Sequence, residues 1–280
     1  MKYIVLSLSN KLRVWTTNFR IAAAFMLGFA MTAYYAHRYI EYACTLGSEI
    51  QCFEVYIWLA SQPRPFCFLI LGGLLLLSDA PFLTPLSLQE MLRIGRKKWV
   101  WSQIAYIFLS CFIYFFSLAF FSFALSYVKV DTYLLGNWSD AMKILAFQQP
   151  DSIFINFGIS FPYPEMLRAL NPISAVCISI LFHSMYLALI SMIVLCVNLL
   201  TRANYGWIIG SCVHFIGYMI EANSGFGMNV KYSLLCCAMP GYQYTASRDM
   251  SPVYCCTVLL LSIYIVVRIC RAYATKIEPF

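Results

Sequence analysis

The sequence has few charged residues. Asp, Glu, Lys and Arg make up only 11% of its 280 residues, whereas soluble domains carry roughly 25%. Hydrophobic residues make up 61%. This composition excludes an ordinary water-soluble domain and favours a membrane protein.

The sequence also lacks the motifs of several kinds of chemistry. It has no Gly-x-x-x-x-Gly-Lys-Ser/Thr sequence, so it lacks the usual phosphate-binding loop of an ATPase. Its Cys and His residues do not follow the spacing of a zinc site. His183, His214 and Glu221 form no recognisable catalytic set with Asp79. We therefore expect no catalytic residues, no metal site and no cofactor bound by this chain.

Long apolar runs are the main feature that is present. Most of them approach the roughly 20 residues that a bilayer-spanning helix needs. We predict an all-α polytopic membrane protein in which a transmembrane domain, 21–280, has six spans, at about 21–36, 57–80, 99–128, 173–200, 205–222 and 253–270. Pro63 and Pro65 interrupt the second run, which predicts a broken or interfacial segment from Tyr56 to Pro65.

The loops between these runs predict the orientation, because Lys and Arg are in excess on the cytoplasmic side of membrane proteins. With six spans and both termini inside, the inner segments hold 12 of the 19 basic residues and 3 of the 12 acidic ones. We expect a multi-pass protein of the cell membrane with both termini cytoplasmic. The net charge of +7 does not indicate nucleic-acid binding, because the cations are divided among several short loops.

The first 20 residues carry apolar side chains at helical spacing, including Ile4, Leu8, Leu12 and Trp15. This pattern predicts an amphipathic helix at the inner membrane interface, held by apolar burial and by attraction of its cations to anionic lipid. The alternative is a cytoplasmic extension of the first span.

The segment between the second and third runs predicts a short cytoplasmic helix, Ser87–Ile94. Ser87 lies three residues before Glu90, the spacing of a capping box, and Gly95 can end the helix. A basic cluster, Arg96–Lys98, follows. On its own this cluster anchors the third span, whereas the rigid helix beside it suits docking to a partner.

The fifth run places small and ionisable residues at intervals of four, four, three and four, which is one helical face. The five residues are Gly206, Gly210, His214, Gly217 and Glu221. One interpretation is a packing face, since small residues allow close helix contact. The other is a polar strip along a substrate pathway, since ionisable groups in a membrane face protein or water. For His183, alone in the fourth run, we expect packing.

The outer loops contain four weaker signals. Residues around Met142–Phe147 suggest an interfacial element, and Asn171 followed by Pro172 suits the start of the fourth span. Asn137-Trp138-Ser139 matches a glycosylation acceptor. Tyr232–Met239 is apolar but too short to cross, which predicts an external re-entrant hairpin.

Cysteines number 12, and most lie in the apolar runs, where a thiol is a small hydrophobe. Cys44 and Cys52 share the first outer loop. An oxidising exterior would permit a disulfide between them.

The order of these elements resembles the membrane subunit of ATP-binding-cassette exporters, the ABC type 2 permease family. The resemblance rests on an N-terminal interfacial helix, Lys2–Phe19, a helix between the second and third spans, Ser87–Ile94, and a hairpin before the last span, Tyr232–Gly241. The outer segment 129–171 is longer than the link usual at that place in the family.

This resemblance implies a permease that exports a peptide, lipid-like or drug-like substrate. It would act with a separate ATPase subunit that binds ATP and Mg, and as a dimer with a second copy or a related permease. By position, the resemblance implies that the residues coupling the permease to the ATPase are Ser87, Glu90, Met91, Arg93, Arg96 and Lys97. It implies that the substrate pathway is lined by Gly206, Gly210, His214, Gly217 and Glu221. The alternative function is a non-transporting membrane interaction or sensor component.

Overall fold

The computed structural model describes residues 2–274 except 14, 16, 79, 82–84, 135, 149–150, 202, 225–228 and 246–249. Within these residues every regular element is helical, as predicted, except for a pair of two-residue parallel strands, β1 (Ile50–Gln51) and β2 (Thr132–Tyr133). The protein is an all-α membrane protein.

Four helices are long and apolar enough to cross a bilayer: α2 (Phe19–Leu46), α6 (Arg96–Lys129), α10 (Pro172–Thr201) and α14 (Pro252–Ala274). A fifth span is formed if α3 (Glu54–Ala60) and α4 (Pro63–Leu77) count as one, since they are joined at a 90° bend. The predicted break before Pro65 is therefore confirmed. The predicted fifth span, 205–222, corresponds to α11 (Gly206–Ala222), which has 17 residues and is not among the helices long enough to count as a span.

The helix ends follow the predicted runs closely, with one clear difference. The first span was predicted to end at 36, but α2 continues past Arg38 and Glu41 to Leu46. Gly47 ends it with a φ of 62°, and its backbone N–H donates to Ala43 and Cys44 carbonyls. The apolar run indicates the part of the helix that suits a lipid environment, whereas the helix itself ends at the Gly47 cap.

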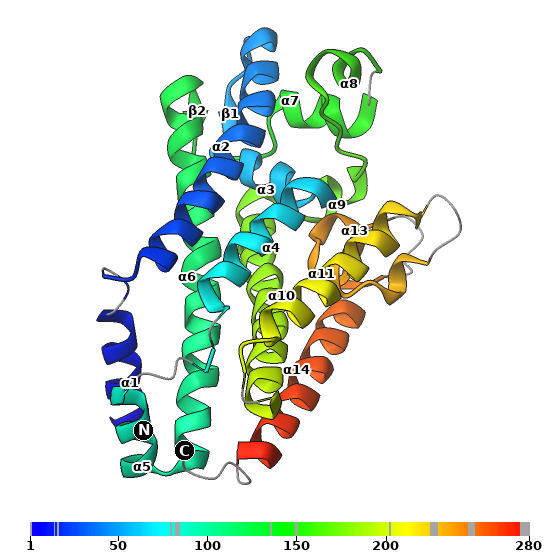
Figure 1. Ribbon diagram of the computed structural model, residues 1–280. Coiled ribbons are helices and arrows are strands. Elements are labelled where there is room, and N and C mark those ends of the chain that lie inside the picture. The colour runs from blue at the N-terminus through cyan, green and yellow to red at the C-terminus, as the bar shows by residue number, and fades with distance from the viewer. Residues whose placement is uncertain are drawn as a thin grey trace.

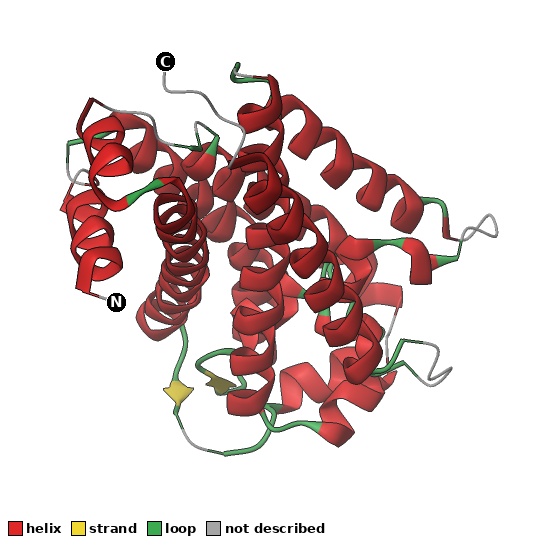
Figure 2. Cartoon of the chain, turned by 90° about the horizontal axis from the view of Figure 1, so that it is seen from below, coloured by secondary structure: helices red, strands yellow, loops and turns green. Residues whose placement is uncertain are grey.

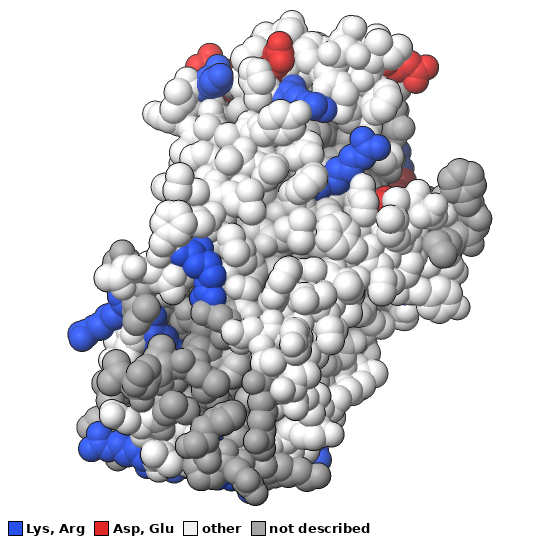
Figure 3. Space-filling view, in the orientation of Figure 1, with Lys and Arg blue, Asp and Glu red and all other residues white. Residues whose placement is uncertain are grey.

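The molecule has two chemically different ends (Figure 1). At one end lie α1 (Lys2–Arg13), α5 (Pro85–Ile94) and the last turns of α14, and at the other lie β1, β2, α7 (Asp140–Lys143) and α8 (Asp151–Phe157). In Figure 3 the acidic side chains lie in the upper half, while the lower end carries basic ones. We refer to these as the basic end and the loop end. Figure 2, seen from below, shows the strands at the edge of the helix bundle.

The N-terminal helix is shorter than predicted and packs against protein. It ends at Arg13, and Phe19 already belongs to α2. Ser7 Oγ lies 3.4 Å from Ser102 Oγ, and Trp15 Nε1 donates to Tyr106 Oη at 2.8 Å. These contacts place α1 and the residues after it along the first turns of α6.

The predicted helix between the second and third spans is present, with a different start. It begins at Pro85, so Ser87 lies inside the first turn and is not the capping residue. Proline suits the first turn because its fixed φ is already helical and its missing N–H needs no partner. The side chains of Ser87 and Glu90 lie outside the described residues. Gly95, at a φ of 82°, separates α5 from α6.

The remaining elements are short. They are the π-helix η2 (Ile144–Gln148), α9 (Pro164–Ala169), the 3₁₀ turn η4 (Val230–Tyr232), α12 (Leu234–Ala238) and α13 (Pro240–Gln243). The interfacial element expected near 142–147 corresponds to α7 and η2. Asn171 caps α10 as predicted, since Ser174 N donates to Asn171 Oδ1 at 2.8 Å.

Candidate functional site

At the basic end, α5 has an anchored side and an exposed side. Met91 is buried and Ile94 packs against the core, so these side chains hold the helix on the bundle. Leu92 is 73% exposed, and Arg93 is exposed too. Of the predicted coupling residues, Met91 thus faces the protein, whereas Arg93 is accessible.

The first turn of α6 extends this exposed surface. Lys97 and Lys98 are exposed and Arg96 is half-buried. We name the side chains of Arg93, Arg96, Lys97 and Lys98 the basic surface. Nearby, the guanidinium of Arg271 lies 5.4 Å from the Trp101 ring centroid, which ties the end of α14 to α6.

The N-terminal half of the α11 face packs on α10. Gly206 N donates to Asn198 Oδ1 at 2.6 Å. A Cβ atom on Gly210 would lie 2.8 Å from Val194 Cγ2 and 3.3 Å from Ile190 Cγ2. Glycine at these two positions lets the two helices approach closely.

His214 in the middle of this face has a partner on each ring nitrogen. Its Nε2 lies 3.1 Å from the Cys67 carbonyl oxygen, and its Nδ1 lies 3.1 Å from Tyr186 Oη. A carbonyl oxygen can only accept, so Nε2 carries a hydrogen, and in a neutral imidazole Nδ1 then accepts from the tyrosine. The imidazole links α4, α10 and α11 through these two contacts.

The C-terminal half of the α11 face contacts the segment of short helices before α14. Ser233 Oγ donates to the Gly217 carbonyl at 2.9 Å, and Tyr242 Oη donates to Glu221 Oε1 at 2.7 Å. All five residues of the face therefore contact other parts of the same chain. Their assignment to a substrate pathway stays a prediction.

Asn198, on the last turns of α10, makes two hydrogen bonds that the sequence did not predict. Its Nδ2 donates to the Ala80 carbonyl at 2.6 Å, while its Oδ1 accepts from Gly206 N. This one buried amide joins the segment leading to α5 with the start of α11.

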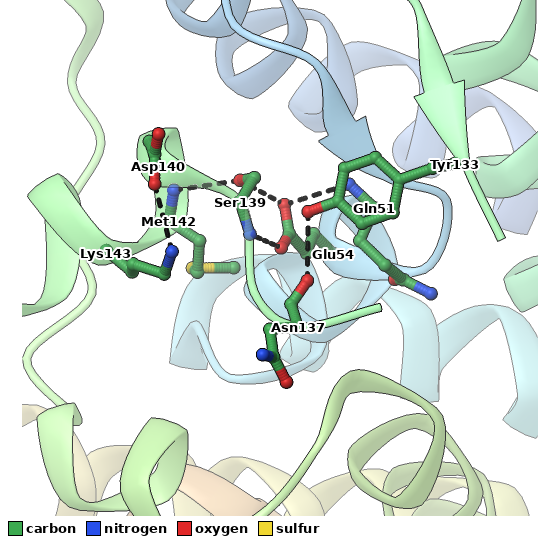
Figure 4. Close-up of polar contacts among 8 residues, drawn as sticks. All are labelled: Gln51, Glu54, Tyr133, Asn137, Ser139, Asp140, Met142 and Lys143. Carbon is green, nitrogen blue, oxygen red and sulfur yellow. Dashed lines mark hydrogen bonds and ion pairs between the residues drawn. The ribbon is translucent and has the colours of Figure 1, made fainter. Parts of the chain in front are cut away.

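The most extensive buried polar site is at the loop end and was missed in the sequence (Figure 4). The Glu54 side chain is fully buried at the start of α3. Ser139 donates to it twice, from its backbone N to Oε1 and from its Oγ to Oε2, both at 2.6 Å. Tyr39 Oη and Gln51 N donate to Oε2 at 3.3 and 3.4 Å. These donors replace the hydration that burial removes from a carboxylate.

Ser139 gives the glycosylation-like triplet a structural explanation. Its Oγ also accepts from Met142 N at 3.1 Å, which caps α7. Asn137 is exposed, and its carbonyl accepts from Tyr133 Oη at 2.9 Å. Burial, with a smaller contribution from the nearby Glu54 carboxylate, raises the pKa of Tyr133 to about 12, so the phenol stays a donor.

The Glu54 site links three segments that are distant in sequence: the outer part of α2, the β1–α3 turn and the start of α7. Its geometry suits an anchor for the loop end, because every contact holds the carboxylate in place. An acidic residue beside an apolar run, as in Glu54–Ala60, is the one signal that could have identified it.

The two cysteines of the first outer loop, Cys44 and Cys52, differ in exposure. Cys44 is exposed and its Sγ lies 3.8 Å from the Lys129 carbonyl, whereas Cys52 is buried, and both are free. In the described part of the chain, no three His, Cys, Asp or Glu side chains group in a way that could hold a metal ion.

Comparisons with known proteins found no matching family model, no matching curated protein and no matching solved structure.

Proposed function

We propose that this chain is the permease subunit of an ATP-binding-cassette exporter, driven by a separate ATPase. The observation that carries the proposal is the placement of α5. It is a short helix between two membrane helices, anchored by Met91 and presenting Arg93 at the basic end. A rigid, exposed helix of this kind can pass a movement of a bound partner to the helices on either side of it.

The proposed topology has six spans and places the basic end in the cytoplasm. It counts α3–α4 as one broken span and α11 as a short one, since spans of about 17 residues occur in membrane helices. The rule that Lys and Arg are in excess inside supports this orientation, and an even number of spans returns α14 to the basic end. Both termini are then cytoplasmic in the cell membrane.

In this proposal α12 and α13 form the external re-entrant hairpin. Leu235, Cys236, Cys237 and Ala238 of α12 are buried, and α12 contacts both α10 and α14. With η4 and the segment before α14, these short helices join two spans without crossing. The hairpin is seated on α11 by the Tyr242–Glu221 hydrogen bond.

The proposed partners follow from two features of the chain, the lack of a phosphate-binding loop in its sequence and the exposed basic side chains of α5 and the first turn of α6. It has no phosphate-binding loop of its own, so ATP and Mg bind the partner ATPase. A second permease copy or a related permease completes the transporter. Differential binding of the ATPase to inward- and outward-facing states then drives export of a peptide, lipid-like or drug-like substrate.

Purification of the tagged full-length chain from its native cells tests the proposal. We expect an ATPase containing a phosphate-binding loop to copurify, with measurable ATP turnover. Arg93→Glu with Lys97→Glu should remove both, while leaving the amount of folded permease unchanged. Lys143→Glu with Arg168→Glu is the matched control, since it reverses two exposed charges at the loop end.

The second candidate function is a non-transporting interaction or sensor component. It is favoured by the α11 face, whose polar groups already have partners within the chain. The ATPase could copurify with an ATP turnover that is the same in the parent and in the Arg93→Glu, Lys97→Glu variant. That result would support the non-transporting function over transport.

A further inference from the structure

Helix α6 carries a second polar face that the sequence pattern did not reveal. Trp99, Gln103, Ser110 and Tyr114 are separated by steps of four, seven and four residues, so they lie on one side of the helix. All four are buried. The face starts near the basic end and extends inward over about 22 Å, at 1.5 Å per residue.

Three of these side chains have polar atoms with no hydrogen-bond partner among the described residues. They are Trp99 Nε1, both amide atoms of Gln103 and Ser110 Oγ. Other buried hydroxyl groups of the same helix are bonded. Ser122 Oγ donates to the Ala119 carbonyl at 2.9 Å, and Ser126 Oγ to the Ser122 carbonyl at 2.9 Å. Within α6, the unpaired groups are therefore confined to the half nearer the basic end, and unpaired buried atoms elsewhere, such as Thr32 Oγ1 and His183 Nε2, lie on other helices.

Tyr114 marks the upper limit of this region. Its Oη donates to the Leu69 carbonyl at 3.0 Å. It also lies where a Cβ on Gly28 would meet it at 2.6 Å, and it contacts the corresponding position of Gly72. At Tyr114 the face thus meets α2 and α4, and this side chain fills the space beside Gly28 and Gly72.

An unpaired donor or acceptor inside a membrane protein is costly, and Gln103 carries one of each. Leucine would fill a similar volume without that cost. Since the face holds no Asp, Glu, His, Lys or Arg side chain, it offers hydrogen bonds without a net charge. A carboxamide oxygen and nitrogen side by side match one donor and one acceptor of another amide.

We propose that Trp99, Gln103 and Ser110 line an inner vestibule that opens to the cytoplasm and binds amide groups of a neutral, peptide-like substrate. The vestibule is closed in this structure and opens when α6 separates from the α2–α4 crossing. This inference rests on the proposed function, to which it adds the substrate class. It also places the hydrogen-bonding lining on α6 and not on α11.

Thiol labelling tests whether water reaches the face. Gln103→Cys and Ser110→Cys are exposed to a charged methanethiosulfonate in inside-out vesicles, and labelled peptides are resolved by mass spectrometry because the chain has 12 native cysteines. Phe112→Cys and Phe116→Cys are the controls, since these side chains are 49% and 55% exposed on the opposite, lipid-facing side of α6. A thiol reacts as its thiolate, so both test sites should label on the order of tenfold faster than the controls.

Equal rates at the test and control sites would overturn the vestibule. A second arm tests the substrate class, with N-acetylalanine methylamide as a neutral amide and acetate as its control. The amide should slow labelling of Ser110→Cys and acetate should not. Identical labelling with and without the amide would contradict the peptide-like substrate.

Thermal stability gives a third, independent measurement. Gln103→Leu removes unpaired polar atoms, so the midpoint of unfolding should rise by about 2–4 °C. Asn198→Leu is the matched control and should lower the midpoint, because both of its amide atoms are bonded. A lower midpoint for Gln103→Leu would show that the Gln103 amide is bonded in the folded protein and would overturn the inference. Labelling without a copurifying ATPase would instead retain the vestibule and reject the proposed function.

Discussion

The polar faces of α11 and α6 differ in one property. On α11, both ring nitrogens of His214 and the carboxylate of Glu221 have partners within the chain. On α6, both amide atoms of Gln103 have none among the described residues. The α11 face has the more conspicuous sequence, with ionisable groups and glycines at helical spacing. Helical spacing in the sequence therefore identifies a polar face of a helix. Whether the groups on that face are already bonded within the chain can be seen only from their hydrogen-bond partners.

The largest effect expected from this comparison is at Gly210. A leucine there meets Val194 and Ile190 on α10 and pushes α11 away from the helix it packs on. Overpacking of this kind typically costs about 1–3 kcal/mol, and more where a backbone cannot shift. Gly210→Leu should therefore strongly reduce the yield of monodisperse protein in size-exclusion chromatography.

Cys212→Leu is the control for that variant, because Cys212 is exposed on the same helix. It adds similar bulk on the outer side of α11 and should leave the yield unchanged. If Gly210→Leu also gave the parent yield, the α11 face would not be a packing face, and the distinction between the two helices would be lost.

A smaller loss of stability is expected at the loop end. There the Glu54 carboxylate is a buried polar group that, like those of α11, has its partners within the chain. Ser139→Ala removes the Oγ bond to Glu54 and the cap on α7. Loss of a hydrogen bond to a buried polar group costs about 1–3 kcal/mol, and the lost cap adds to this. The midpoint of thermal unfolding should fall measurably.

Asn137→Gln separates this role from glycosylation. It destroys the acceptor triplet but leaves the contacts of Ser139 with Glu54 intact. We expect parental stability for Asn137→Gln and reduced stability for Ser139→Ala. Equal losses in both variants would point to a sugar on Asn137 and not to the Glu54 site.

The positions of the helices could be predicted from the sequence, because long apolar runs and Pro or Asn signals are local. The bend before Pro63 and the cap at Asn171 are examples. An acidic residue beside an apolar run could have singled out Glu54, but its partner could not be predicted, since Ser139 lies 85 residues away and nothing local pairs the two. The unpaired state of Gln103 was equally hidden, because a missing partner becomes visible only once α2, α4 and α10 are packed around α6.

The smallest loss of stability is expected for a substitution of His214, which tests whether this residue of the α11 face has only a structural role. Because Nε2 donates to Cys67 and Nδ1 accepts from Tyr186, glutamine can replace both bonds with its amide nitrogen and oxygen. A purely structural role therefore predicts that His214→Gln lowers stability by about 1 kcal/mol or less, whereas His214→Leu loses more because two buried groups are left unpaired. The two variants are compared by thermal unfolding and by ATP turnover of the purified complex. If His214→Gln kept its stability but changed turnover, ionisation or exact ring chemistry would matter at this position. The α11 face would then regain the pathway role that its sequence suggested.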